Sequence, residues 1–366
     1  RNFISWYLNG SRGGKLKDAA LVAFISPDSE DWRFSLVKMD YKFEKTAPDK
    51  IKVVQQFTPA KRSSFLVGIN ENSHTAQIRF LQILINDEYY PKIEDLEEAF
   101  NVEVVTKEFF EEYRNLFLKT KLILDEIVEI DSKVRQEFES KNINSVDFAK
   151  KLLGQITFLY FLQKKGWFGV EKGKQWGSGS KDFLRKLFDK KFKDYKNFYN
   201  EILEPLFYEA LRTDRSDVDH YYSMFNCKLP FLNGGLFDPI KDYDWVSTNI
   251  LLPNELFSNL KGTFKDFGDG ILDVFDRYNF TVNEEEPLEK EVALDPELLG
   301  KIYEKLNAIR PDNFDEYLNV LNSGKKGEEI KFNKEHGVYY TPREIVHYIC
   351  QESLINYLVT ELSNYC

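Results

Sequence analysis

The chain has 366 residues, of which 42% are hydrophobic and 30% charged, a composition typical of a globular protein with two or three domains. No apolar run is long enough to cross a membrane, and no basic segment precedes an apolar stretch as in a secretory signal. We therefore expect a cytoplasmic protein without membrane contact. The three cysteines are widely spaced, which argues against a disulfide scaffold and against a cysteine-ligated metal site.

The first part of the chain has the pattern of β-strands. Residues 19–26 form a continuous apolar run, and residues 32–39 resume with β-favouring side chains after a turn, which predicts a hairpin. Residues 51–57 predict a third strand. We therefore expect a small α/β region at the N-terminal end of the chain.

Helical periodicity begins near residue 74 and continues through the middle of the chain. Apolar side chains recur every three to four residues over residues 106–130 and again from Ser145, and Gly166 is suited to end the second of these helices. Shorter helices are predicted over residues 74–85, 93–100, 181–190 and 194–210. The expected fold is mainly α with a small α/β N-terminal region, divided into residues 1–90, 91–290 and 291–366.

Charge is distributed unevenly along the chain. The net charge is −10, yet residues 150–200 carry thirteen basic and four acidic side chains, a net charge of +9, with aromatic residues between them. Clustered cations bind a phosphate backbone by releasing its counterions, which predicts contact with DNA. A solvated lysine-rich surface over an aromatic core is the alternative. The candidate DNA-binding residues are Lys164, Lys165, Arg185, Lys186, Lys190 and Lys191.

A short pattern in the strand region matches the metal-binding sequence of many nucleases. Pro27 and Asp28 are followed by Asp40 and Lys42, and such a site needs two carboxylates to hold Mg²⁺ and a lysine close to the attacking water. Asp28, Asp40 and Lys42 are therefore nuclease candidates, although we expect them not to form a complete site. A turn followed by a charged strand end is the alternative interpretation.

Residues 337–346 have the pattern of a helix start. Thr341 and Glu344 have the spacing of a capping box, in which each side chain binds the backbone amide of the other, and Pro342 would occupy the first helical position. The sequence therefore predicts a helix that begins at Pro342.

Four segments of the chain resemble the large type IIG restriction–modification enzymes, which fuse an endonuclease to an adenine-N6 DNA methyltransferase. The resemblance implies a helical connector that leads into the start of a methyltransferase domain. It also implies that Tyr340, Thr341 and Pro342, with Gly337, line the methionine end of S-adenosylmethionine, at a helix N-terminus suited to a carboxylate. The segments are LLGQITFLYFLQKKGWFGV (152–170), FNCKLPFLNGGLFDP (225–239), ALDPELLGKIYEKL (293–306) and GVYYTPREIVHYICQESL (337–354).

The chain departs from this family by omission, since it has neither the Asp-Pro-x-x-Gly-Ser-Gly cofactor loop nor the Asn-Pro-Pro-Tyr loop for the extruded adenine. We therefore expect a fragment that is inactive alone and binds no cofactor, whereas the full-length parent would use S-adenosylmethionine and Mg²⁺. The parent would methylate adenine N6 at specific sites in double-stranded DNA and cleave unmodified DNA. Two alternatives stay open: a methyltransferase-only parent similar to a type I modification subunit, and a non-enzymatic helical module that docks DNA or a partner.

Overall fold

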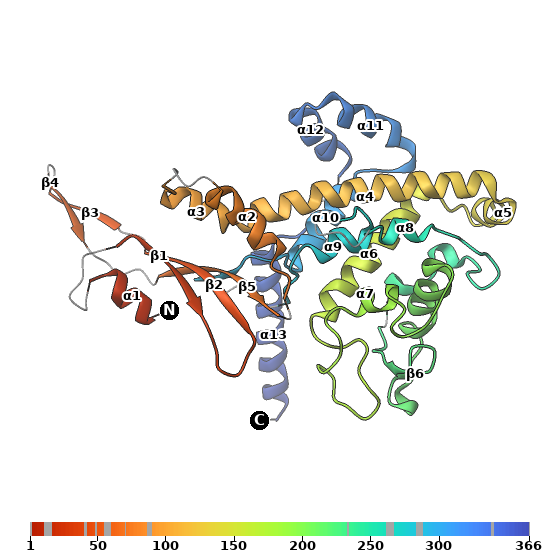
Figure 1. The fold of residues 1–366 in the computed structure, drawn as a ribbon, viewed down its shortest axis with the longest axis horizontal. Helices are drawn as coiled ribbons and strands as arrows, with labels where there is room; N and C mark the ends of the chain where they lie inside the picture. Colours follow the sequence, from red (N-terminus) through yellow and green to blue (C-terminus); the bar gives the residue numbers. More distant parts are fainter. Residues whose placement is uncertain are drawn as a thin grey trace.

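The structure is a computed structural model, and it describes most of the chain. The described residues are 2–10, 17–39, 42–47, 50–54, 60–69, 71–85, 90–232, 234–260, 267–282, 288–337 and 340–365. Among them, no helix combines the length and the apolar character that a membrane crossing requires. The mainly helical fold with a small strand-containing N-terminal region is confirmed (Figure 1).

A four-stranded sheet forms the N-terminal part of the molecule (Figure 1). Its order is β1-β2-β5-β8, with antiparallel β1–β2 and β2–β5 pairs and a parallel β5–β8 pair. The predicted hairpin is confirmed as β1 and β2. The ion pairs Arg33–Glu291 (3.1 Å) and Arg62–Glu289 (2.6 Å) join β8 to β2 and β5, respectively. The strands are β1 (Ala19–Phe24), β2 (Asp31–Lys38), β5 (Lys61–Gly68) and β8 (Glu289–Glu291).

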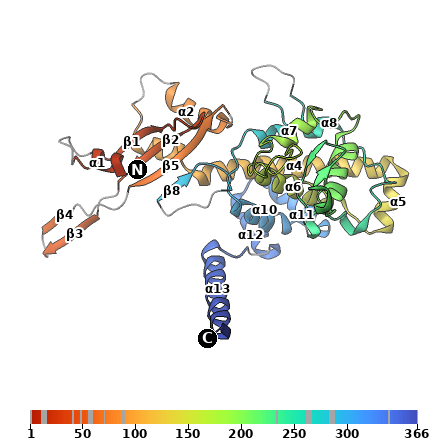
Figure 2. The same cartoon turned by 90° about the horizontal axis from the view of Figure 1, so that it is seen from below.

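A separate hairpin of β3 (Lys42–Ala47) and β4 (Lys50–Val54) extends from the side of the sheet (Figure 2). The predicted third strand is therefore β4, but its partner is β3 and not the predicted hairpin. The strand that does pair with β2 is β5, for which the sequence pattern predicted no strand. Its buried residues Phe65 and Val67 alternate with a less buried one, as in a strand with one face on the core.

Two long helices organise the rest of the fold. α4 (Val102–Ile130) and α6 (Ser145–Gln163) pack against each other, and both begin at an asparagine cap. The Asn101 side chain accepts a hydrogen bond from the amide of Glu103 (2.9 Å), and Asn144 accepts one from the amide of Asp147 (2.8 Å). The Ser145 start is confirmed. Gly166 follows α6 with a φ of +66°, the left-handed conformation expected after a helix end.

The remaining elements surround this pair or extend from it. Figure 2 shows α13 projecting away from the body of the molecule. The helices are α1 (Asn2–Leu8), α2 (His74–Leu84), α3 (Ile93–Ala99), α5 (Ser132–Ser140), α7 (Phe183–Phe188), α8 (Asn254–Phe257), α9 (Ile271–Asp276), α10 (Glu297–Asn307), α11 (Phe314–Ser323), α12 (Lys326–His336) and α13 (Arg343–Tyr365). Two π-helical segments, η1 (Tyr199–Leu203) and η2 (Leu206–Ala210), replace the helix predicted over residues 194–210, and a small hairpin joins β6 (Tyr221–Tyr222) to β7 (Cys227–Lys228). Short 3₁₀ turns lie at η3 (Ser216–Val218), η4 (Gly235–Phe237), η5 (Ile240–Asp242) and η6 (Pro311–Asn313).

One cluster of buried side chains runs through most of the molecule. It extends from Leu36 in β2 to Phe332 in α12 and is rich in phenylalanine and tyrosine, so it crosses all three of the expected divisions. Edge-to-face pairs such as Phe109–Phe275, with ring centroids 5.2 Å apart, are frequent in it. The high aromatic content of the sequence is therefore used largely in the core.

Candidate functional site

The Tyr-Thr-Pro segment lies against α10. The Tyr340 amide donates a hydrogen bond to Glu304 Oε2 (3.1 Å), and the Tyr340 ring lies so close to Gly300 that a Cβ atom on residue 300 would overlap it. Only glycine fits at this position of α10 while the ring stays in place. Two of the four segments on which the family resemblance rests therefore interlock, although about 40 residues of sequence separate them.

The predicted capping box does not form. α13 begins at Arg343, one residue later than predicted, and the Pro342 carbonyl accepts the first helical hydrogen bond from the amide of Val346 (3.1 Å). Pro342 is therefore the N-cap residue, and Thr341 precedes it. No hydrogen bond joins Thr341 and Glu344 in the part of the chain that the structure describes. The prediction of Thr341 as the cap is wrong, since Thr341 lies one position before the residue whose carbonyl accepts the first helical hydrogen bond.

Gly337 ends α12 beside the same segment. Its amide donates to the Asn333 carbonyl (2.8 Å), and a Cβ atom on residue 337 would overlap that carbonyl oxygen. Gly337 therefore has a steric role at the helix end. It lies three residues before Tyr340, but the two residues between them are outside the described part of the chain.

This arrangement fits one wall of a cofactor site. Tyr340 is 47% exposed, so its ring offers an aromatic surface while one part of the ring packs on Gly300 and Glu304 binds the backbone amide. α13 begins three residues after Tyr340, and the amides at a helix start favour an anionic group. The described residues supply no further wall opposite this one, so S-adenosylmethionine binding stays a prediction for Tyr340, Thr341 and Pro342.

The six basic candidates differ in their surroundings. Lys165, Lys190 and Lys191 are exposed, and Lys190 pairs with Asp194 within its own turn (2.7 Å). Lys186 pairs with Asp182 (2.8 Å), and the largely buried Lys164 pairs with Glu71 (2.8 Å). The structure thus divides the basic segment into an exposed group, Lys165, Lys190 and Lys191, in which Lys190 pairs with the exposed Asp194, and a less exposed group, Lys164, Arg185 and Lys186, in which every cation holds a carboxylate.

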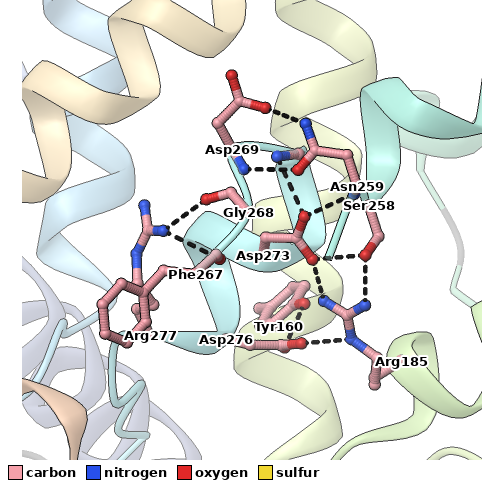
Figure 3. A network of polar contacts seen from close by, with 11 residues as sticks. Tyr160, Arg185, Ser258, Asn259, Phe267, Gly268, Asp269, Asp273, Asp276 and Arg277 are labelled. Atoms are coloured by element: carbon pink, nitrogen blue, oxygen red, sulfur yellow. Dashed lines mark hydrogen bonds and ion pairs between the residues drawn. The ribbon is translucent and has the colours of Figure 1, made fainter. Parts of the chain in front are cut away.

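Arg185 belongs to the second group, and its guanidinium is held between two carboxylates (Figure 3). Its guanidinium donates to Asp273 (2.9 Å), Asp276 (2.6 Å) and the Ser258 hydroxyl (2.9 Å), and its side chain is only 16% exposed. Asp276 also accepts a hydrogen bond from Tyr160 (2.7 Å), and burial raises the pKa of its carboxyl group. The local sequence does not indicate this network, because its acidic members lie about 90 residues from Arg185.

A cleft of about 640 Å³ lies beside this network. Its walls include Lys164, Lys181 and Lys186 together with Asp182 and Asp276. The lysines face carboxylates, since Lys164 and Lys181 both approach Glu71 and Lys186 approaches Asp182. Because the charges are nearly balanced, this cleft is less suited to a phosphate backbone than the exposed lysines around Lys190.

The described residues do not place the three nuclease candidates relative to one another. Asp28 is exposed in the turn between β1 and β2, Asp40 lies outside the described residues, and Lys42 begins β3 without a described side chain. No group of three or more His, Cys, Asp or Glu side chains is placed to hold a metal ion in the described ranges. The nuclease pattern of Asp28, Asp40 and Lys42 therefore stays a prediction.

The chain is similar to a restriction–modification protein. A Methanocaldococcus jannaschii protein named "Putative type II restriction enzyme and methyltransferase" is 29% identical to it over 282 residues. The alignment covers 69% of this chain and 19% of that protein, so the chain spans about a fifth of the relative's length. No family model and no solved structure matches the chain.

Proposed function

We propose that the chain forms the helical connector and the entrance to the methyltransferase domain of a type IIG restriction–modification enzyme. That enzyme acts on double-stranded DNA, methylates adenine N6 with S-adenosylmethionine, and cleaves unmodified sites with Mg²⁺. The similarity to the M. jannaschii protein carries this proposal. The interlocking of Tyr340 with Gly300 supports it, because it joins the segment proposed to line the cofactor to the helical body.

The surface of α13 also supports the proposal. Apolar side chains such as Ile345, Leu354, Leu358 and Leu362 are between 45% and 65% exposed on this helix. A helix with exposed apolar residues on several faces normally packs against other protein. We propose that α13 packs against the methyltransferase core, with the Tyr-Thr-Pro segment at the edge of that interface.

The cofactor part of the proposal is tested in the full-length enzyme. Tyr340→Ala removes the half-exposed ring, and we expect it to raise the dissociation constant for S-adenosylmethionine by about tenfold, since the ring is worth roughly 1–2 kcal/mol of contact. Tyr90→Ala is the matched control, because Tyr90 is also an exposed tyrosine (89%) and lies before α3, away from α13. Calorimetric titration gives the affinities, and thermal melts show whether both variants stay folded. Equal affinity in wild type and Tyr340→Ala would refute the cofactor role.

The DNA part is tested with the exposed lysines alone. The triple variant Lys165→Glu, Lys190→Glu and Lys191→Glu leaves the Arg185 network intact, and we expect it to weaken DNA binding. The slope of the logarithm of the DNA-binding constant against the logarithm of the salt concentration is negative. Its magnitude should decrease by about 2–3, because each lost phosphate contact contributes about 0.9. The matched control reverses three exposed lysines near α12, Lys325, Lys331 and Lys334, so that both proteins change charge equally. Fluorescence anisotropy over a salt series measures both, and equal weakening in the two would assign binding to net charge rather than to the basic segment.

A further inference from the structure

A second cleft, of about 350 Å³, lies between α6, α10 and the turn η4. Its floor and sides are mostly apolar: Ile302 and Leu306 come from α10, Leu236 comes from η4, and the aromatic side chain of Tyr303 stands beside it. Three of the four segments that carry the family resemblance therefore contribute to one cleft. Its size and its apolar lining with a few polar groups are those of a small-molecule site.

Two glycines face this cleft without a steric reason to be glycine. Gly154 lies inside α6 with an ordinary helical backbone, and a Cβ atom there would meet nothing within 4 Å. A Cβ atom on Gly235 would meet only the Asp238 carboxylate, at 3.8 Å. A glycine inside a helix costs about 0.5–1 kcal/mol relative to alanine. The backbone at Gly154 and Gly235 therefore leaves an open surface in the cleft on which a planar group fits.

Two lysines stand at the mouth of the cleft. Lys151 Nζ donates to the Gly235 carbonyl (3.0 Å), the one hydrogen bond that the described residues give it, although an ammonium has three donors. Lys150 lies beside it and contacts Asp147 (3.5 Å) and the Ile309 carbonyl. Burial lowers the pKa of both ammonium groups. Carboxylates nearby oppose this shift, Asp147 for Lys150 and Asp238 with Asp242 for Lys151. The groups that line the cleft itself are two lysines and one aspartate, so an anionic ligand there would meet a small excess of positive charge.

We propose that this cleft binds a nucleotide. Its base lies flat on the backbone of Gly154 and Gly235 beside the Tyr303 ring, and its phosphate contacts Lys150 and Lys151. An aromatic ring suits the flat glycine surface, and lysine ammonium groups bind phosphate as point charges. The nucleotide is either free or an unpaired nucleotide of a DNA strand, and these two sources share the same chemistry. The proposal does not depend on the Tyr-Thr-Pro segment.

The test is a calorimetric titration of the intact chain with three ligands. These are adenosine 5′-monophosphate, adenosine, and a short single-stranded oligonucleotide. We expect the monophosphate or the oligonucleotide to bind, and the one that binds more tightly identifies the source. Gly154→Leu fills the cleft and should abolish binding while the melting temperature stays equal or rises, because leucine is the better helix former. Gly327→Leu in α12 is the matched control, since a Cβ atom there also meets nothing within 4 Å.

Lys151→Met tests the phosphate contact. Removing a charge-assisted hydrogen bond should lower the affinity for the monophosphate by about ten- to a hundredfold and leave the affinity for adenosine nearly unchanged. If Gly154→Leu does not fold, Gly154→Val keeps the steric test with a smaller side chain. Absence of binding by both phosphate ligands at millimolar concentration, or binding that Gly154→Leu and Lys151→Met leave unchanged, would overturn the proposal.

Discussion

Arg185→Met is expected to lower the free energy of unfolding by about 3–5 kcal/mol. The substitution removes the only cation that contacts the fully buried Asp273 in the described structure, and it also releases Asp276 (Figure 3). Two carboxylates then face each other without compensation, and hydrogen bonds from Ser258 and from backbone amides cannot neutralise them. The loss should be smaller at pH 5 than at pH 8, because burial already raises the pKa of Asp276 and its protonation removes an uncompensated charge.

Urea denaturation of wild type and variant measures this effect. Lys190→Met is the control from the same basic segment. Its pair with Asp194 is exposed, so we expect a change within about 0.5 kcal/mol. Asp273→Asn in the Arg185→Met background should recover part of the loss, because it removes one of the unpaired charges. A change below about 1 kcal/mol in Arg185→Met would show that the network contributes little and would return Arg185 to the set of candidate DNA-binding residues.

Local patterns in the sequence predicted the elements that local interactions determine. The hairpin of β1 and β2 follows from two apolar runs around a turn, and α4 and α6 follow from their apolar faces. The start of α6 could be predicted to the residue because Asn144 caps it with its own side chain. The mainly helical class was therefore accessible from the sequence alone.

The differences arise where distant segments determine local structure. β5 was missed, and its position depends on pairing with β2 and with β8, which lies more than 220 residues later. Just before α13, the amide of Tyr340 is bound by Glu304 from α10, a contact that the pattern of residues 337–346 does not show. Arg185 was grouped with the DNA-binding candidates because charge counted along the sequence does not show which cations are already paired. Each of these features depends on a tertiary contact with no counterpart in the local pattern.

A buried acid between the two π-helical segments is a further feature that the sequence does not indicate. Glu204 is completely buried between η1 and η2, where it accepts hydrogen bonds from the Tyr243 hydroxyl (2.6 Å) and from the Asn200 side chain (2.8 Å). Tyr199 contacts Tyr243 (3.2 Å) and completes an aromatic enclosure. Burial raises the pKa of Glu204 to about 8, although the hydrogen bonds from Tyr243 and Asn200 oppose this shift. Glu204 is therefore mostly protonated in the folded protein at neutral pH.

The raised pKa makes the stability of the fold depend on pH in a defined direction. Below the ordinary glutamate pKa, near 4.5, the carboxyl group is protonated in both the folded and the unfolded chain and contributes no difference. Between that value and about 8, the unfolded chain has lost the proton while the folded protein keeps it. Glu204 therefore lowers stability as pH rises through this window, by about 1.4 kcal/mol per pH unit, and its contribution is constant above it.

Glu204→Gln is expected to remove this dependence and to stabilise the protein at pH 8. The glutamine carbonyl still accepts a hydrogen bond from the Tyr243 hydroxyl. The Asn200 side chain can turn so that its oxygen accepts a hydrogen bond from the glutamine NH₂ group. At pH 5 we expect wild type and variant to have nearly equal free energies of unfolding. At pH 8 we expect the variant to be more stable by a few kcal/mol, on the order of 1.4 kcal/mol for each pH unit between the two pKa values. Glu209→Gln, an exposed position on η2, is the matched control and should keep the wild-type pH dependence. Urea denaturation at half-unit steps from pH 5 to pH 8.5 measures the slopes. Parallel slopes for wild type and Glu204→Gln would mean that Glu204 is ionised in the folded protein, and that the tyrosines around it stabilise the carboxylate rather than the acid.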